Sequence, residues 1–227
     1  FLFVALPCCH CATLDGPVIG VWQSMGSSFM NHSILPYYRI YQNWVEQFGA
    51  STTILPEDGD VETVFRSMDA LLLPGGRTAP SPSFVNKLIQ RAIRANDEGE
   101  YFPVWGTCLG FEWIIETIGG NTSLQLNKFD AEDQAGNLKF TRQSPGRLFG
   151  SANESLIQWF SNDNVIYENH EDGITPVRFA QYAQLASMFN ILSTGVDKKN
   201  LAYVSTIEAK SMPIYGIQFH PEKIRYS

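Results

Sequence analysis

The sequence predicts an α/β protein in which a mostly parallel sheet carries helices on both faces. Short apolar runs, each long enough for one strand, alternate in the first half of the chain with stretches whose apolar residues recur every three to four positions. This alternation is typical of parallel sheets, whose strands are joined by crossover helices and covered on both faces. The 227 residues suffice for one domain with a large core.

The expected strands are short apolar runs that stop at turn residues. They cover residues 17–22, 52–55, 70–73, 102–105 and 214–219. The run 70–73 leads straight into Pro74-Gly75-Gly76, 102–105 meets Gly106, and 214–219 leads into His220.

The expected helices are amphipathic. The first has apolar residues at positions 37, 40, 41, 44, 45 and 48, which lie on one helical face, and Gly49 follows as its stop. Further helices are expected over 61–68 and 84–93, and after Cys108 as far as residue 118. The stretch 121–206 is less regular and predicts antiparallel strands with one helix near 156–160. No repeat or linker divides the chain, so residues 15–227 are expected to form a single domain.

Composition excludes several classes of protein. Hydrophobic residues make up 44% and charged residues 17% of the chain, which is typical of a globular protein and argues against disorder. A formal net charge of -7 makes a nucleic-acid surface a poor expectation. Beyond the first residues, no apolar run is long enough to cross a bilayer.

Residues 1–14 are interpreted as the remnant of a secretory signal peptide, because an apolar run is followed by small residues. The alternatives are a short buried strand or a remnant of cloning. Three of the 4 cysteines lie in this leader, so its removal leaves only Cys108, a candidate nucleophile. Sequons at Asn31, Asn121 and Asn153 agree with a secretory route.

Cys108 lies in Gly106-Thr-Cys-Leu-Gly110, between an expected strand and an expected helix. Glycines permit a sharp turn at the nucleophile, and the helix N-terminus is expected to favour the thiolate. The backbone N–H of Leu109 would point to the same place as the sulfur and stabilise an oxyanion. The alternative is an inert buried cysteine beside a tight turn. The pattern favours the nucleophile.

His220 and Glu222 follow the last expected strand in Gln-Phe-His-Pro-Glu. Residues two apart in an extended segment point the same way, and Pro221 biases His220 toward an extended backbone. The carboxylate is therefore expected to orient the imidazole, as a base needs. An isolated histidine would more often be a satisfied core or surface residue, but its place at a strand end favours the base.

Two weaker signals complete the set. Gly75 and Gly76 are expected to bring backbone N–H groups against the oxyanion, although a plain turn is the alternative. His170 lies in the polar run Glu168-Asn-His-Glu171, whose spacing alone favours a surface histidine on a loop. No cluster of histidines and carboxylates with the spacing of a metal site is found, so no metal is expected.

Longer segments around these motifs resemble the gamma-glutamyl hydrolases, or folylpolyglutamate hydrolases. Residues 101–112, Tyr-Phe-Pro-Val-Trp-Gly-Thr-Cys-Leu-Gly-Phe-Glu, resemble the family's nucleophile segment, and residues 213–223, Pro-Ile-Tyr-Gly-Ile-Gln-Phe-His-Pro-Glu-Lys, resemble its base segment. Residues 17–20 and 73–76 fall in the family's order. The similarity covers nearly all of the chain after the leader. Ordinary glutaminase domains share only the shorter G-x-C-x-G and H-P-E.

The resemblance implies a doubly wound, flavodoxin-like sheet of the class I glutamine amidotransferase type, without a cofactor. It implies cysteine-dependent hydrolysis of gamma-glutamyl bonds in folate or antifolate poly-gamma-glutamates, through a thioester. The expected location is a lysosome, a vacuole or the extracellular space. A homodimer is expected because family members often form one, whereas no nucleic-acid or membrane partner is.

By position, the resemblance gives Cys108 the nucleophile role, His220 the base role and Glu222 the orienting role. It places His170 near the substrate, and it aligns Tyr41 with a tyrosine of the first helix thought to face the site. The family continues beyond its base segment, so the chain is expected to be truncated at its C-terminus. Residues 121–146 match the family poorly.

Two other functions are compatible with the same fold. One is the glutaminase part of a biosynthetic amidotransferase, against which the leader and the sequons argue. The other is a non-catalytic binding protein, against which the intact set of Cys108, His220 and Glu222 argues.

Overall fold

An eight-stranded sheet runs through the protein in the order β4-β1-β5-β6-β12-β11-β10-β8. The structure is a computed structural model that describes residues 16–23, 27–30, 33–77, 79–120 and 126–223. The parallel strands are β1 (Val18–Trp22), β4 (Ser51–Leu55), β5 (Ala70–Leu73), β6 (Val104–Thr107) and β12 (Ile214–Ile217). Antiparallel strands β11 (Ala202–Ala209), β10 (Phe189–Val196) and β8 (Lys139–Phe140) extend one edge.

The parallel strands confirm the predicted fold class. Taken in chain order, these strands stand as 2-1-3-4-5, which is the flavodoxin-like arrangement. β12 lies between β6 and β11, so the last strand along the chain joins the parallel and antiparallel parts of the sheet. The carboxyl ends of β5, β6 and β12 therefore meet at one edge, where ligands of such sheets bind.

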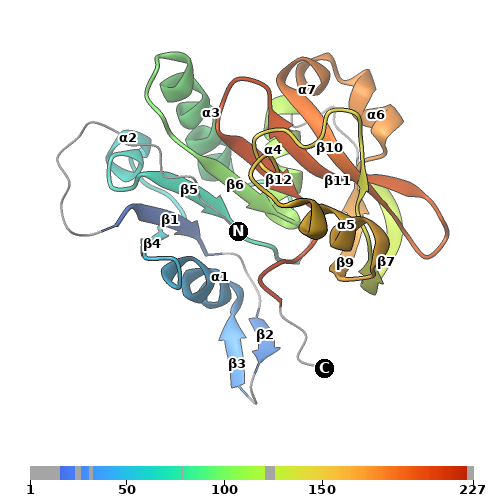
Figure 1. Ribbon diagram of the computed structural model, residues 1–227. Helices are drawn as coiled ribbons and strands as arrows, with labels where there is room; N and C mark the ends of the chain where they lie inside the picture. The colour runs from blue at the N-terminus through green and yellow to red at the C-terminus, as the bar shows by residue number, and fades with distance from the viewer. Residues whose placement is uncertain (1–15, 24–26, 31–32, 78, 121–125, 224–227) are drawn as a thin grey trace.

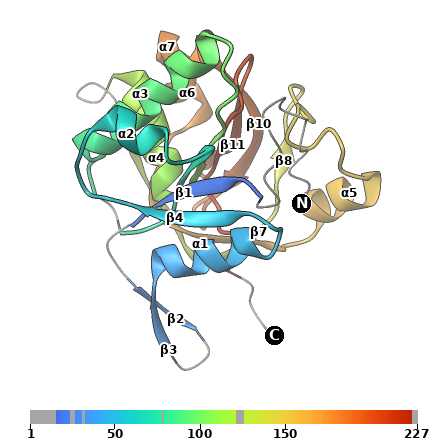
Figure 2. The same cartoon turned by 90° about the vertical axis from the view of Figure 1, so that its left-hand side faces the viewer.

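Helices cover both faces of the sheet, as predicted. Helix α1 (Tyr37–Glu46) packs on one face, where Ile19, Val21 and Leu72 form its apolar floor. The opposite face carries α2 (Val61–Phe65), α3 (Ser83–Asp97) and α4 (Leu109–Gly119). Figures 1 and 2 show α1 on one side of β1 and β4 and α2 and α3 on the other. Alternate residues of each strand thus enter two separate cores.

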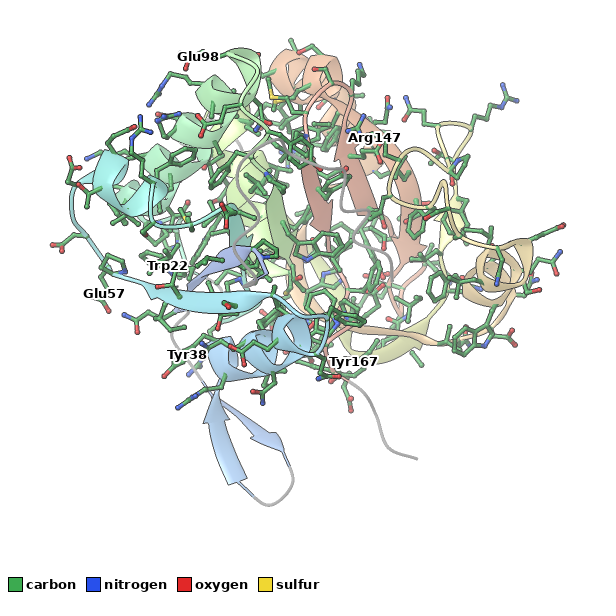
Figure 3. The ribbon with its side chains drawn as sticks, turned by 60° about the vertical axis from the view of Figure 1, so that its left-hand side comes forward. Trp22, Tyr38, Glu57, Glu98, Arg147 and Tyr167 are labelled. Carbon is green, nitrogen blue, oxygen red and sulfur yellow. The ribbon has the colours of Figure 1, made fainter. Side chains whose placement is uncertain are left out.

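The larger core includes Trp22 at the end of β1, labelled in Figure 3. Its ring lies 6.4 Å from the rings of Phe84 on α3 and Trp113 on α4. Figure 1 also shows the hairpin of β2 (Ser27–Met30) and β3 (Ser33–Pro36), which the sequence did not predict, extending away from the sheet.

The second half of the chain folds over the carboxyl edge. Strands β7 (Asn127–Gly136) and β9 (Ile166–Gly173) form a separate antiparallel pair, with α5 (Glu154–Asn162) between them in sequence. The predicted antiparallel strands and the predicted helix near 156–160 are therefore present. The short helices α6 (Pro176–Gln181) and α7 (Ala183–Met188) were not predicted.

Several boundaries differ from the prediction; the strand expected over 214–219, for example, ends at Ile217. The strand expected over 102–105 begins at Val104 and runs through Thr107, directly to Cys108. Phe102 instead stacks on Phe65 of α2, with ring centroids 4.1 Å apart. The helix expected over 61–68 ends after Phe65.

The interpreted leader, with Cys8, Cys9 and Cys11, lies outside the described residues, as do Asn31 and Asn121. Within the described part of the chain, every helix is too short or too polar to cross a membrane.

Candidate active site

Cys108 occupies a sharp turn between β6 and α4. Its φ is 50° and its ψ is -108°, a conformation that residues with a side chain rarely adopt. Its N–H donates to the Ile217 carbonyl of β12 at 2.8 Å, and its carbonyl accepts from the Glu112 N–H at 3.0 Å. The strain is thus held on both sides by backbone hydrogen bonds, and the sulfur stands at the end of the sheet.

The two glycines of the motif are required for close packing. A Cβ on Gly106 would lie 2.6 Å from the backbone of Gly110, and a Cβ on Gly110 would lie 2.1 Å from the Leu73 carbonyl oxygen. The first turn of α4 therefore rests directly on the backbone of β5 and β6. Larger residues at either position would push the turn that carries Cys108 away from the sheet.

Burial governs the protonation of the thiol. Cys108 is 5% exposed, and burial raises its pKa well above the ordinary value, with Glu112 and Glu222 adding to the effect. The Leu109 N–H and the Lys223 ammonium act in the opposite direction but are outweighed. Desolvation is the larger effect on the thiol, and it opposes the thiolate that the helix N-terminus is expected to favour. The resting group is a thiol, and reaction requires a base.

His220 and Glu222 lie side by side after β12, as predicted, but a turn at Pro221 and Glu222 brings them together and not the expected extended segment. The Nδ1 atom of His220 lies 2.7 Å from Oε1 of Glu222, and both side chains are buried. Burial tends to raise the pKa of Glu222, but the charge and hydrogen bond of His220 lower it below its usual range. The carboxylate thus fixes the ring with a hydrogen on Nδ1. The buried Nε2 has no hydrogen-bond partner within the described part of the chain.

Strand order brings His220 and Cys108 to the same edge of the sheet. β6 and β12 are parallel neighbours, with Thr107 opposite Ile217, so both residues follow the carboxyl ends of adjacent strands. β9 contacts both: the Tyr167 carbonyl accepts from the His220 N–H at 3.0 Å, and the Asn169 carbonyl lies 4.0 Å from the Cys108 sulfur. Tyr167 is labelled in Figure 3, below the sheet. One strand therefore braces nucleophile and base.

Tyr41 lies behind this pair. Its hydroxyl donates to Oε1 of Glu222 at 2.8 Å and accepts from the Gly75 N–H at 2.8 Å. The side chain is fully buried, and burial followed by the charge of Glu222 raises its pKa well above normal. The O–H hydrogen is used by Glu222 and a lone pair by the Gly75 N–H, so Tyr41 supports Glu222 in this structure.

The two glycines that follow β5 differ in their surroundings. The Gly75 N–H is engaged by Tyr41, and a Cβ at this position would lie 2.6 Å from Cε1 of His220. Gly75 therefore gives the imidazole room. Of the pair predicted as oxyanion donors, this leaves Gly76 better suited to act with Leu109.

His170 is neither exposed nor on a loop, so the interpretation drawn from its spacing is wrong. It lies on β9 and is 4% exposed. Its ring contacts the rings of Phe129 and Tyr203, with centroids 6.1 Å and 4.6 Å away. Polar residues alternate along β9, but the partner strand β7 and the strand β11 bury one face of it, which spacing within 168–171 does not reveal.

Sequence reasoning missed a buried carboxyl group beside the nucleophile. Glu112 lies one helical turn after Cys108 and accepts from the Gln218 side chain at 3.0 Å. Burial raises its pKa to about 7, against the opposing effects of Gln218 and His170. Glu112 and Gln218 both lie in the segments that resemble the family, and that resemblance was the signal that could have found them. Among the residues described, no three metal-binding side chains are grouped to hold an ion.

A cysteine on a strand-to-helix elbow, in a flavodoxin-like sheet extended by antiparallel strands, defines an α/β protein of the glutamine amidotransferase type. The family model "Glutamine amidotransferase class-I" matches residues 37–226. A putative GMP synthase component of Thermoplasma acidophilum shares the fold with a TM-score of 0.58 at 20% identity, over 92% of this chain and 86% of that one. A glutamine amidotransferase of Thermotoga maritima has a TM-score of 0.56 at 12% sequence identity, over 92% of this chain and 77% of that one.

Curated relatives narrow the assignment. Gamma-glutamyl hydrolase 1 of Arabidopsis thaliana is 35% identical over 91% of this chain and 63% of its own length. Gamma-glutamyl hydrolase B of Dictyostelium discoideum is 32% identical over 93% of this chain and 64% of its own length. The Homo sapiens gamma-glutamyl hydrolase is 31% identical over 96% of this chain and 70% of its own length. The chain belongs to the class I glutamine amidotransferase family and, within it, to the gamma-glutamyl hydrolases. It spans just under two thirds of the Arabidopsis and Dictyostelium relatives.

Proposed function

We propose that this chain hydrolyses gamma-glutamyl bonds of folate or antifolate poly-gamma-glutamates, with Cys108 as nucleophile, His220 as base and Glu222 as its orienting group. The observation that carries the proposal is the buried imidazole whose Nδ1 is held by Glu222 while Nε2 has no hydrogen-bond partner among the described residues. That nitrogen can accept the proton of the Cys108 thiol, which burial keeps neutral at rest.

In the first half of the proposed reaction, the thiol proton passes to Nε2 of His220 as the sulfur attacks the gamma-carbonyl carbon. The backbone N–H groups of Leu109 and Gly76 stabilise the oxyanion. The tetrahedral intermediate then collapses: the C–N bond breaks, and Nε2 returns its proton to the leaving amine. The products are a thioester on Cys108 and a shortened chain with a free amino group.

In the second half, a water molecule replaces the amine. His220 removes a proton from the water as the oxygen attacks the thioester carbon. The C–S bond breaks, the sulfur recovers the proton, and the gamma-carboxylic acid leaves. Both halves use the same base and the same oxyanion site, so no further titrating group is needed.

The experiment compares substrates and variants. The chain is incubated with pteroylpentaglutamate or with free glutamine, and the products are identified by mass spectrometry. Shortened pteroyl species are expected from the first and little ammonia from the second. Preferential release of ammonia from glutamine would favour a glutaminase instead. Binding of the pentaglutamate without any cleavage would favour a non-catalytic binding protein.

Cys108→Ala should abolish cleavage and leave folding and substrate binding intact, because the sulfur makes no strong hydrogen bond that the fold depends on. Substantial hydrolysis by this variant would exclude Cys108 as the nucleophile. Arg66→Ala, on the exposed end of α2, is a control that leaves the site untouched.

We further propose that residues 15–227 form one hydrolase domain that enters the secretory pathway and reaches a lysosome, a vacuole or the extracellular space. Asn153 supports this route: it is exposed at the start of α5, and its Oδ1 accepts from the Leu156 N–H at 2.7 Å, which leaves its side-chain nitrogen out of the helix cap. A homodimer stays a prediction of the family resemblance.

Expression in a secretory host tests the route. Peptide mass spectrometry should find an N-glycan on Asn153, and Ser155→Ala should remove it while leaving the helix cap in place. An unmodified Asn153 in the secreted protein would remove this support.

A further inference from the structure

One ring nitrogen of His170 must carry a hydrogen. Nδ1 lies 2.9 Å from the backbone carbonyl oxygen of Asp172, at hydrogen-bond distance and buried. A carbonyl oxygen can only accept, so Nδ1 is the donor. In a neutral imidazole, this leaves Nε2 as a bare acceptor.

The other nitrogen faces an acid. Nε2 of His170 lies 3.4 Å from Oε2 of Glu168, and each side chain is 1% exposed. The two residues are two apart on β9, so they stand on the same buried face of the strand. A bare Nε2 would oppose its lone pair to a buried carboxylate without water between them, which is costly. One proton shared by Nε2 and Oε2 removes this conflict.

The groups around the ring do not supply an alternative donor to Nε2. The Tyr203 hydroxyl faces Glu168, whose charge, after burial, helps to raise the pKa of Tyr203. Lys128 pairs with Asp172 at 2.8 Å, on the other side of the ring. The titratable and charged groups that face His170 come from four elements and are Glu168 and Asp172 (β9), Lys128 (β7), Tyr203 (β11) and Glu112 (α4). Most of these groups are acids.

The backbone between Glu168 and His170 lies next to the nucleophile. Asn169, between Glu168 and His170, presents its carbonyl 4.0 Å from the Cys108 sulfur. On α4, His170 favours the ionised form of Glu112, one turn from Cys108. The charge of His170 therefore acts on Glu112, one turn from Cys108, while Nδ1 lies against Asp172 and Nε2 against Glu168.

We propose that Glu168 is a positioning residue that keeps His170 protonated, so that the imidazolium acts on the site through its charge and not through a hydrogen bond to the substrate. The Nδ1–H is held by the Asp172 carbonyl, and the Nε2–H faces the Glu168 carboxylate, 3.4 Å away. A buried cation beside the nucleophile suits a substrate that carries several carboxylates. This last consequence rests on the proposed function.

The direct test observes the ring itself and needs no substrate. The chain contains 4 histidines, so ¹⁵N-detected histidine NMR of the full chain is simple, and loss of one signal in His170→Gln assigns it. Both nitrogens of His170 should be protonated at pH 7 in the unmodified chain. In Glu168→Gln, which keeps the size of the side chain, Nε2 should lose its proton at pH 7. A bare Nε2 in the unmodified chain would overturn the proposal.

Two further variants separate charge from general damage. Glu171→Gln removes a carboxylate of the same strand on its exposed face, and Tyr203→Phe removes the hydroxyl that faces Glu168 with little change in volume. Both should keep Nε2 protonated. If either loses this proton as Glu168→Gln does, Glu168 does not hold it.

The functional consequence is read from the pH profile of kcat/KM with a poly-gamma-glutamate. The alkaline limb should move to lower pH by about one pH unit in Glu168→Gln, which is the usual influence of a nearby carboxylate, and stay in place in Glu171→Gln. An unmoved limb together with a lost Nε2 proton would overturn the functional part. A chain without hydrolytic activity would refute the proposed function alone, because the NMR result stands apart from it.

Discussion

Replacing Tyr41 by Phe tests how the base is held. The variant removes one oxygen that joins two buried groups: it donates to Glu222 at 2.8 Å and accepts from the Gly75 N–H at 2.8 Å. The ring itself stays, so the apolar packing of α1 on β1 and β5 is retained.

The cost follows from the two lost bonds. A hydrogen bond to a charged group contributes about 1.5–3 kcal/mol, and a buried N–H without a partner costs about 1–3 kcal/mol. Because water can partly enter the space of one oxygen, we expect a loss near the lower end of the combined range, about 3 kcal/mol of unfolding free energy. Glu222 then orients His220 less firmly, and kcat should fall on the order of tenfold.

Urea denaturation measures the first effect and steady-state kinetics the second. Tyr38→Phe, the same deletion three residues earlier on α1, is the matched control and should change stability by less than about 0.5 kcal/mol. A support role lowers kcat and leaves KM nearly unchanged, whereas a substrate contact raises KM. A Tyr41→Phe variant with unchanged stability, or with a raised KM alone, would refute the reasoning.

Three other predictions concern single groups. The pKa of Glu112 is raised to about 7, so its contribution to stability is complete below about pH 4.5 and is lost as the pH rises through 7. Over that window, urea titrations should show the unmodified chain losing about 3 kcal/mol of unfolding free energy relative to Glu112→Gln. A difference between the two proteins that stays constant with pH would contradict this. Gly75→Ala places a Cβ 2.6 Å from Cε1 of His220, so kcat should fall at least tenfold while circular dichroism stays unchanged; full activity would show that the ring can move aside. Asn153→Ala should cost about 1 kcal/mol through loss of the α5 cap, and Asn153→Asp should not, as thermal unfolding of the unglycosylated chain will show.

The parallel half of the fold was predictable because each of its elements is encoded locally. The run 70–73 is apolar without a break, and it is a strand over Ala70–Leu73. The apolar face from Ile40 to Val45 and the stop at Gly49, whose φ is 84°, are properties of a few neighbouring residues. The sequence also predicted that His220 and Glu222 lie side by side, although a turn closed by the bond from the Lys223 N–H to the His220 carbonyl produces this relation, and not the extended backbone expected.

The predictions that failed concern features that depend on distant parts of the chain. β9 is polar, and it is a buried strand only because β7, some 40 residues earlier, pairs with it. The protonation of Cys108 depends on how much protein covers it, which the motif around the residue does not encode. The buried contact of Glu168 and His170 has the same origin, because β7 and β11 cover a run of residues that reads as exposed in the sequence.

The central claim is that Cys108 attacks the gamma-carbonyl with His220 as its base. Acid-quenched intact-mass spectrometry during turnover of a poly-gamma-glutamate tests this step directly. A covalent acyl adduct should appear, map to the peptide containing Cys108, be released by hydroxylamine as a thioester, and be lost in His220→Ala. Turnover without an adduct on Cys108, or an adduct that forms equally fast in His220→Ala, would contradict the account.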